Sequence, residues 1–82
     1  MTRDEIFNVI VQNSREVIPE LEVYCFVDRD RLADLGANSI DRADIIMMTL
    51  ESLSLKIPLV ELGRVKDLGE LADVLYEKHL ST

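Results

Sequence analysis

The 82-residue sequence is poor in the residues that build covalent and metal-based sites. It has one cysteine, Cys25, so neither an internal disulfide nor a thiolate metal cluster can form. It has one histidine, His79, so no histidine pair is available for a metal site. We therefore expect Cys25 to be a small buried apolar residue in a reducing compartment.

Long apolar runs are also missing. No stretch approaches the roughly 18 apolar residues that cross a bilayer, and the start, MTRDEIFNVIV, is acidic where a signal peptide would be basic. These absences predict a cytoplasmic protein without a membrane segment.

Positive charge is scarce. Nine Lys and Arg face sixteen Asp and Glu, giving a net charge of −7. This balance argues against nucleic acid and against an anionic membrane surface, and it favours basic partners, although the same charge also aids solubility. With 48% hydrophobic residues the chain can bury a core, and its length fits one domain over residues 1–82, which we expect to be a monomer.

The first half predicts one helix followed by a long connection. Thr2 and Glu5 form the pattern of a capping box, and Pro19 should end the helix near Val17. The segment 19–38 contains several apolar residues and should pack onto the helices. These residues are Leu21, Val23, Phe26, Val27, Leu32 and Leu35. A strand in this segment is rejected because no second strand candidate lies nearby.

The second half predicts further helices. One should run from about Ser39 to Leu53, and a short turn should end at Gly63. Asp67 should cap a last helix, in which Gly69 would let another group come close. The expected fold class is all-α: a small four-helix bundle, with three main helices, a short one and a long first loop.

The helix that begins near Ser39 has more apolar surface than one core face requires. On a helical wheel its apolar arc spans roughly 140°, against about 100° for a helix packed on one side. The arc contains Ile40, Ala43, Ile46, Met47, Leu50, Leu53 and Ile57. Ile45 and Met48 lie off this arc and are expected to meet the first loop.

The surplus apolar surface lies at one edge of this helix. There Ile40 and Met47 border the carboxylates of Asp44 and Glu51. We call these four residues the docking edge, because an apolar strip rimmed by one charge suits a partner. Periodicity alone equally allows the first loop to cover it.

Ser39 has two interpretations. A serine at a helix start is most often the N-cap, but Asn38, with Asp41 three residues later, is an equally good cap. If Asn38 caps, the Ser39 hydroxyl is free at the positive end of the helix dipole, which favours a phosphate. Nothing in the sequence links His79 to Ser39 as a base, so we do not expect the chain to be an enzyme.

The segment DLGANSIDRADI, residues 34–45, resembles the acyl carrier protein family, whose pattern is D-L-G-A/x-D-S-L-D before an acidic amphipathic helix. The resemblance covers most of the chain, including the first helix, the long apolar loop, the Ile57–Pro58 pair and the final VKDLGELADVL.

This resemblance implies that Ser39 carries a 4′-phosphopantetheine group. Coenzyme A would be the donor, and a separate magnesium-dependent phosphopantetheinyl transferase the catalyst. The arm would hold an acyl group as a thioester. The family's docking positions would match or lie near Ile40, Asp44, Met47 and Glu51. The acyl chain could fold back near Leu62 and Val65.

Several residues depart from the general family pattern, namely Asn38, Ile40, Arg42, Leu59 and Arg64. The form GANSIDRADI is more similar to the free-standing carriers of polyketide β-branching cassettes. Such a carrier holds malonyl and then acetyl groups, so the implied partners are a malonyl transacylase, a ketosynthase and a hydroxymethylglutaryl-synthase-like enzyme. Three alternatives stay open: a fatty-acid carrier, an aminoacyl or peptidyl carrier, and an unmodified helical adaptor.

Overall fold

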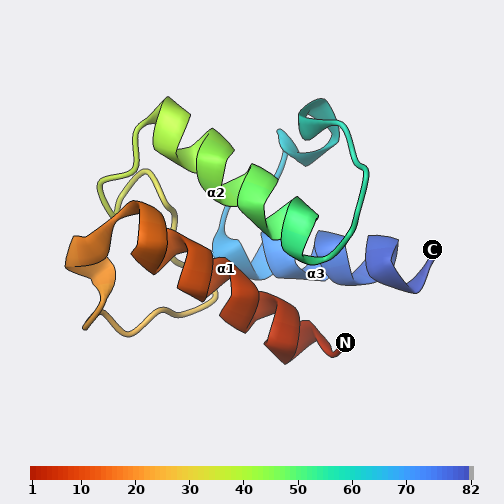
Figure 1. Ribbon diagram of the computed structural model, residues 1–82, viewed down its shortest axis with the longest axis horizontal. Coiled ribbons are helices and arrows are strands. Elements are labelled where there is room, and N and C mark those ends of the chain that lie inside the picture. Colours follow the sequence, from red (N-terminus) through yellow and green to blue (C-terminus); the bar gives the residue numbers. More distant parts are fainter. Residues whose placement is uncertain (82) are drawn as a thin grey trace.

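The computed structural model describes residues 1–81 and contains three α-helices, α1 (Arg3–Val17), α2 (Ser39–Ser52) and α3 (Leu68–Leu80) (Figure 1). Two 3₁₀ helices, η1 (Pro19–Leu21) and η2 (Leu59–Leu62), lie in the connections. No strand occurs within residues 1–81, which confirms the all-α prediction. The four-helix description is confirmed only in part, because its short helix is the 3₁₀ turn η2 and η1 was not predicted. Thr82, the last residue of the predicted 1–82 domain, lies outside the described residues.

Local hydrogen bonds explain where the first and last helices begin. The Glu5 amide donates to Thr2 Oγ1 at 3.1 Å, and the Thr2 amide donates to Glu5 Oε1 at 2.8 Å, as the capping box predicts. The bond from the Thr2 amide is the main cause that lowers the pKa of Glu5. Asp67 caps α3 by accepting from the Glu70 amide at 2.9 Å. None of the helices in residues 1–81 is long and apolar enough to span a membrane.

The core forms where α1 packs against both α2 and α3. Its completely buried apolar side chains come from all three helices: Ile6, Ile10, Ile45, Ala72 and Leu75. The helical wheel placed Ile45 outside the core-facing arc, which was wrong, because Ile45 and Thr49 are both fully buried and Ile45 belongs to the core. The helical wheel counted apolar residues only, so it missed this buried face, on which Thr49 is polar. The Thr49 hydroxyl donates to the Ile45 carbonyl and accepts from Asn13 of α1 at 2.9 Å, so its burial leaves no polar atom unpaired.

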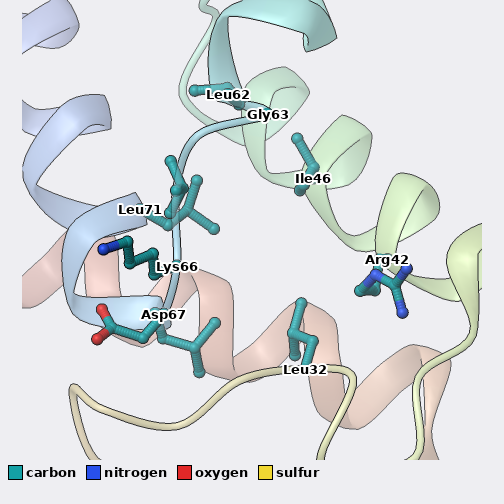
Figure 2. A pocket seen from close by; sticks show the side chains of 10 residues that line it. Leu32, Arg42, Ile46, Leu62, Gly63, Lys66, Asp67 and Leu71 are labelled. Atoms are coloured by element: carbon teal, nitrogen blue, oxygen red, sulfur yellow. The ribbon is translucent and has the colours of Figure 1, made fainter.

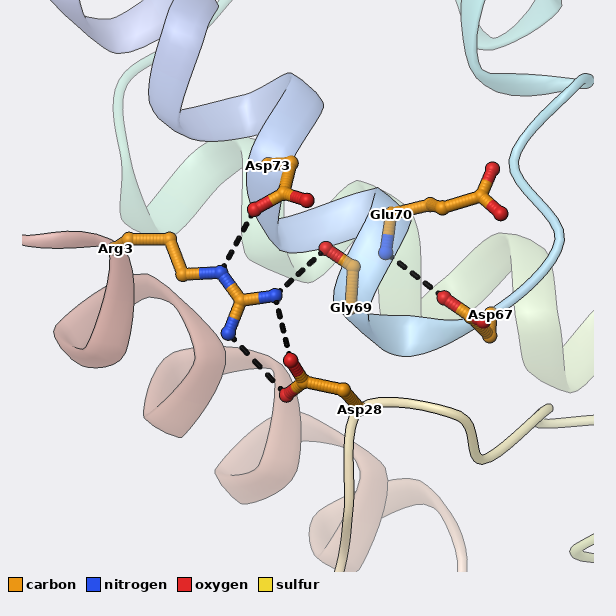
Figure 3. A network of polar contacts seen from close by, with 6 residues as sticks. All are labelled: Arg3, Asp28, Asp67, Gly69, Glu70 and Asp73. Atoms are coloured by element: carbon orange, nitrogen blue, oxygen red, sulfur yellow. Dashed lines mark hydrogen bonds and ion pairs between the residues drawn. The ribbon is translucent and has the colours of Figure 1, made fainter.

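The first loop is attached to α3 by a polar network centred on Arg3 (Figure 3). Its guanidinium donates to Asp28 in the loop, to Asp73 in α3 and to the Gly69 carbonyl, at 2.8 to 3.2 Å. The hydrogen bond with Asp28 is the main cause that raises the pKa of Arg3. The amide of Gly69 donates to the Asp28 carbonyl at 2.7 Å. The predicted close approach at Gly69 is therefore confirmed.

The predicted packing of the loop is confirmed for Leu21, Phe26, Leu32 and Leu35, and it is wrong for Val23 and Val27. Tyr24 and Phe26 turn inward, and their rings meet edge to face at 5.1 Å. Val23 is 90% exposed, and Val27 is exposed as well. Cys25 lies between the two inward aromatic residues and is also exposed, so its predicted burial was wrong. Successive side chains of this non-helical segment point to opposite sides, and the larger aromatic residues occupy the inner side.

Candidate functional site

Ser39 lies where a tight turn meets α2. Gly36 has a φ of +97°, a left-handed conformation that only glycine adopts at little cost. The following residue, Ala37, is buried and donates its amide to the Leu32 carbonyl at 3.0 Å. These contacts hold the turn against the core, so the next residues emerge at the surface, where Ser39 is exposed.

Asn38, and not Ser39, caps α2. The Asp41 amide donates to Asn38 Oδ1 at 2.8 Å, and the Asn38 amide donates to an Asp41 carboxylate oxygen at 3.4 Å. Ser39 is therefore the first helical residue, and its hydroxyl is not used in the cap. Of the two interpretations of Ser39, the structure selects the exposed hydroxyl at the positive end of the helix dipole.

His79, the residue considered as a base for this hydroxyl, lies on a different helix. His79 lies in the last turn of α3 and approaches the N-terminal amine at 3.5 Å. In Figure 1 the end of α3 lies toward the opposite side of the molecule from the start of α2. Within residues 1–81 no group of three or more His, Cys, Asp and Glu side chains is arranged to hold a metal ion.

The docking edge is open to solvent. Ile40 is 70% exposed and Met47 is 56% exposed, so the first loop does not cover them. Asp44 and Glu51 are exposed beside them. All four residues lie on one side of α2, because they follow one another at intervals of three or four residues.

A recess extends this exposed surface toward η2, which the sequence analysis did not anticipate. Met47 and Glu51 line the recess together with Leu59, the first residue of η2. Its volume is about 350 Å³. Val60, the next residue, is 84% exposed. The pattern of apolar residues in α2 could not reveal this extension, because η2 is contributed by a separate segment of the chain.

A second pocket, of about 250 Å³, lies between α2 and the segment that joins η2 to α3 (Figure 2). Leu62 and Val65, the two residues expected near an acyl chain, both line it. Arg42 also lines it, and donates to the Ala37 carbonyl at 2.8 Å. The sequence identified Arg42 only as a departure from the family pattern. Its spacing of three residues from Ser39 was the available signal that both lie on one side of α2.

Comparison with known proteins gives two similarities that extend over nearly the whole chain. The polyketide biosynthesis acyl-carrier-protein AcpK of Bacillus subtilis (strain 168) is 55% identical over 78 residues, which are 95% of this chain and 95% of AcpK. No family model matches the chain.

The second similarity is to a solved structure. A chain in the crystal structure of the curacin biosynthetic pathway HMG synthase in complex with acetyl donor-ACP matches with a TM-score of 0.91 and 44% identity. The match covers 95% of this chain and 100% of that chain. Both similarities therefore concern the complete helical arrangement and not a single motif.

Proposed function

Because this chain belongs to the acyl carrier protein family, we propose that it carries acyl groups as thioesters on a 4′-phosphopantetheine arm attached to Ser39. Coenzyme A is the donor of the arm, and a phosphopantetheinyl transferase catalyses the attachment. The chain itself is the carrier and supplies no catalytic group.

The observation that carries this proposal is the state of the Ser39 side chain. It is exposed on the first residue of α2, while Asn38 and Asp41 supply the cap. A phosphate ester on Ser39 would therefore displace no capping bond. The amide dipoles of α2 would stabilise its negative charge. The residues present thus fit the group.

The proposed pathway is polyketide biosynthesis, in which the protein would carry malonyl and acetyl groups for β-branching. Two findings support it: the similarity to a polyketide biosynthesis carrier, and the similarity to an acetyl donor-ACP that was crystallised with an HMG synthase. A malonyl transacylase would load the arm, and a decarboxylating ketosynthase-like enzyme would produce the acetyl group. A hydroxymethylglutaryl-synthase-like enzyme would receive it.

We assign partner binding to the docking edge. The exposure of Ile40 and Met47 between the carboxylates of Asp44 and Glu51 supports this assignment. A partner with an apolar contact surrounded by Lys or Arg would complement it in shape and in charge. The transferase and the acyl-handling enzymes would use this surface in turn, since each must reach the arm at the adjacent Ser39.

The test is mass spectrometry of the intact protein after incubation with coenzyme A and a promiscuous transferase. The wild type should gain one phosphopantetheine, and Ser39→Ala should gain none. Ser39→Ala should also keep its stability, because Asn38 provides the cap. The matched variant Asn38→Ala keeps the hydroxyl but loses the cap, and should lose about 1 kcal/mol of unfolding free energy.

Three results would contradict the proposal. Modification of Ser39→Ala would move the arm to another residue. A wild type that is never modified would favour the unmodified adaptor, which needs only the docking edge. Attachment of the arm followed by preferential loading of amino acids would favour the peptidyl carrier.

A further inference from the structure

The pocket beside α2 is small and mostly apolar. Ile46, Leu62 and Leu71 contribute apolar side chains to its wall (Figure 2). Its volume of about 250 Å³ lies below the 300–1,000 Å³ that is usual for pockets of drug-sized ligands. It therefore fits a short acyl group better than a long chain.

Arg42 lies between this wall and Ser39. The residues Ser39, Arg42 and Ile46 are separated by three and four positions, so they follow one another along one side of α2. Ile46 and Arg42 both line the pocket. An arm that leaves Ser39 and folds back into the pocket consequently passes the Arg42 guanidinium.

Most of the hydrogen-bonding capacity of Arg42 is unused within the part of the chain that the structure describes. Of its five N–H groups, Nη1 donates to the Ala37 carbonyl at 2.8 Å. Within residues 1–81 no carboxylate lies at ion-pair distance from Arg42, although the chain has sixteen acidic residues. Arg3, in contrast, is paired with both Asp28 and Asp73. A half-buried and unpaired guanidinium beside an apolar pocket is suited to an anionic ligand.

The other charged groups at the opening do not cancel this preference. Figure 2 shows Lys66 and Asp67 across the opening from Arg42. The Asp67 carboxylate is used as the N-cap of α3, where it accepts from the Glu70 amide. Lys66 adds a second positive charge at the rim. Two cations therefore face one carboxylate that already has a partner.

We propose that Arg42 binds the free carboxylate of a dicarboxylic acyl group, of the malonyl type, when the arm on Ser39 folds into this pocket. The inference rests on the proposed function and adds the class of cargo that the pocket selects. A planar guanidinium can donate two parallel hydrogen bonds to a carboxylate, and a neutral acetyl group offers no equivalent acceptor. Removal of the carboxylate by a partner enzyme would release CO₂, place a proton on the carbon and abolish the contact.

The test compares three forms of ¹⁵N-labelled protein, loaded by a promiscuous transferase with coenzyme A, acetyl-coenzyme A or malonyl-coenzyme A. The Arg42 Nε–H resonance should shift in the malonyl form only. The rate at which hydroxylamine cleaves each acyl thioester is divided by the rate for the corresponding acyl-coenzyme A. This normalised rate should be about fivefold lower for the malonyl form than for the acetyl form, as expected for one partly exposed charge pair.

Variants then assign the effect. Arg42→Gln should remove both the resonance shift and the slower cleavage, and Arg42→Lys should retain part of the protection. Arg64→Gln is the matched control, because it removes the same charge from an exposed residue that does not line the pocket, and it should behave like the wild type. Circular dichroism of each variant shows whether the fold is intact.

Three results would overturn the proposal. Equal shifts of Arg42 in all three loaded forms would mean that it contacts the phosphate of the arm and not the cargo. Equal cleavage in wild type and Arg42→Gln would remove its role in selection. Absence of any added mass at Ser39 would refute the proposed function together with this inference, and the mass spectrum separates this case from the other two.

Discussion

Gly69 is a residue at which the first loop and α3 come very close to each other. A Cβ atom at this position would lie 2.8 Å from Asp28 Cβ and 3.1 Å from the Asp28 carbonyl oxygen. Neither is the end of a flexible side chain, and Asp28 is also held by Arg3. A methyl group there would force the loop away from α3.

We therefore predict that Gly69→Ala destabilises the protein. Alanine would gain about 1 kcal/mol in helix propensity, but overpacking costs about 1–3 kcal/mol, so the net loss should be near 1 kcal/mol. For a domain of this size, the melting temperature should fall by roughly 4–8 °C. Thermal denaturation followed by circular dichroism measures it.

Gly63→Ala is the control for this prediction. Its Cβ would meet the Val60 carbonyl oxygen at an ordinary 3.4 Å, so its stability should stay close to that of the wild type. If Gly69→Ala were as stable as Gly63→Ala, the prediction would be wrong, because the first loop would then move away from the added methyl group at little cost in free energy.

At the scale of the element, α2 presents three differently used sides. Ile45 and Thr49 face the core, and Thr49 receives a hydrogen bond from α1. The side with Ser39 and Arg42 leads to the pocket. The docking edge faces solvent. One helix of fourteen residues thus holds the proposed attachment residue, one wall of the pocket and the proposed partner surface in fixed relative positions.

For the docking edge we predict that Asp44→Lys slows modification by the transferase. A rim charge pair contributes up to about 1 kcal/mol, so the rate at low substrate concentration should fall about two- to fivefold. The thermal stability should be nearly unchanged, because Asp44 is exposed and has no ion-pair partner within residues 1–81.

The control for Asp44→Lys is Glu16→Lys, which makes the same change of charge on an exposed residue of α1. The transferase should modify this variant at nearly the wild-type rate. The wild-type rate should also fall with added salt, because screening weakens the steering of charged partners. A rate that neither Asp44→Lys nor salt affects would remove Asp44 from the partner surface.

At the scale of the whole molecule, a net charge of −7 lies on a body with principal extents of 34 × 23 × 20 Å. Such a charge favours encounter with basic enzymes generally, so it cannot by itself distinguish one partner from another. Discrimination must come from local differences, of which Asn38 and Arg64 are exposed examples.

We predict that the acetyl-loaded protein serves a hydroxymethylglutaryl-synthase-like enzyme better than a fatty-acid ketosynthase. Asn38→Asp combined with Arg64→Glu should shift this preference toward the ketosynthase, because it restores acidic residues beside α2. The shift should be several-fold, since each exposed charge contributes about 0.5–1 kcal/mol. Arg42 is left unchanged because it faces the pocket.

Comparison of kcat/KM for both enzymes, with the wild type and with this double variant, measures the preference. If kcat/KM with the wild type were equal or higher for the ketosynthase, the proposed role in polyketide β-branching would be refuted, while the carrier function would stand.

The sequence by itself determined the features that depend on neighbouring residues. Capping at Thr2 and Asp67 was predicted correctly, because an N-cap bonds amides only two or three residues away. At the start of α2 the sequence left Ser39 and Asn38 as alternative caps, and the structure selects Asn38. Helical period alone also placed Ile40 and Met47 at one edge of this helix, but it left open whether the first loop covers them, and the structure shows both exposed.

Only the tertiary structure decided the features that join distant segments. The core position of Ile45 depends on where α1 packs, and the exposure of Cys25 depends on which side of the loop meets α1. The pocket joins Arg42 of α2 to Leu62 of η2 and Leu71 of α3. The period of one helix cannot specify which of its sides another segment will cover, because that choice is made by the packing of the whole chain.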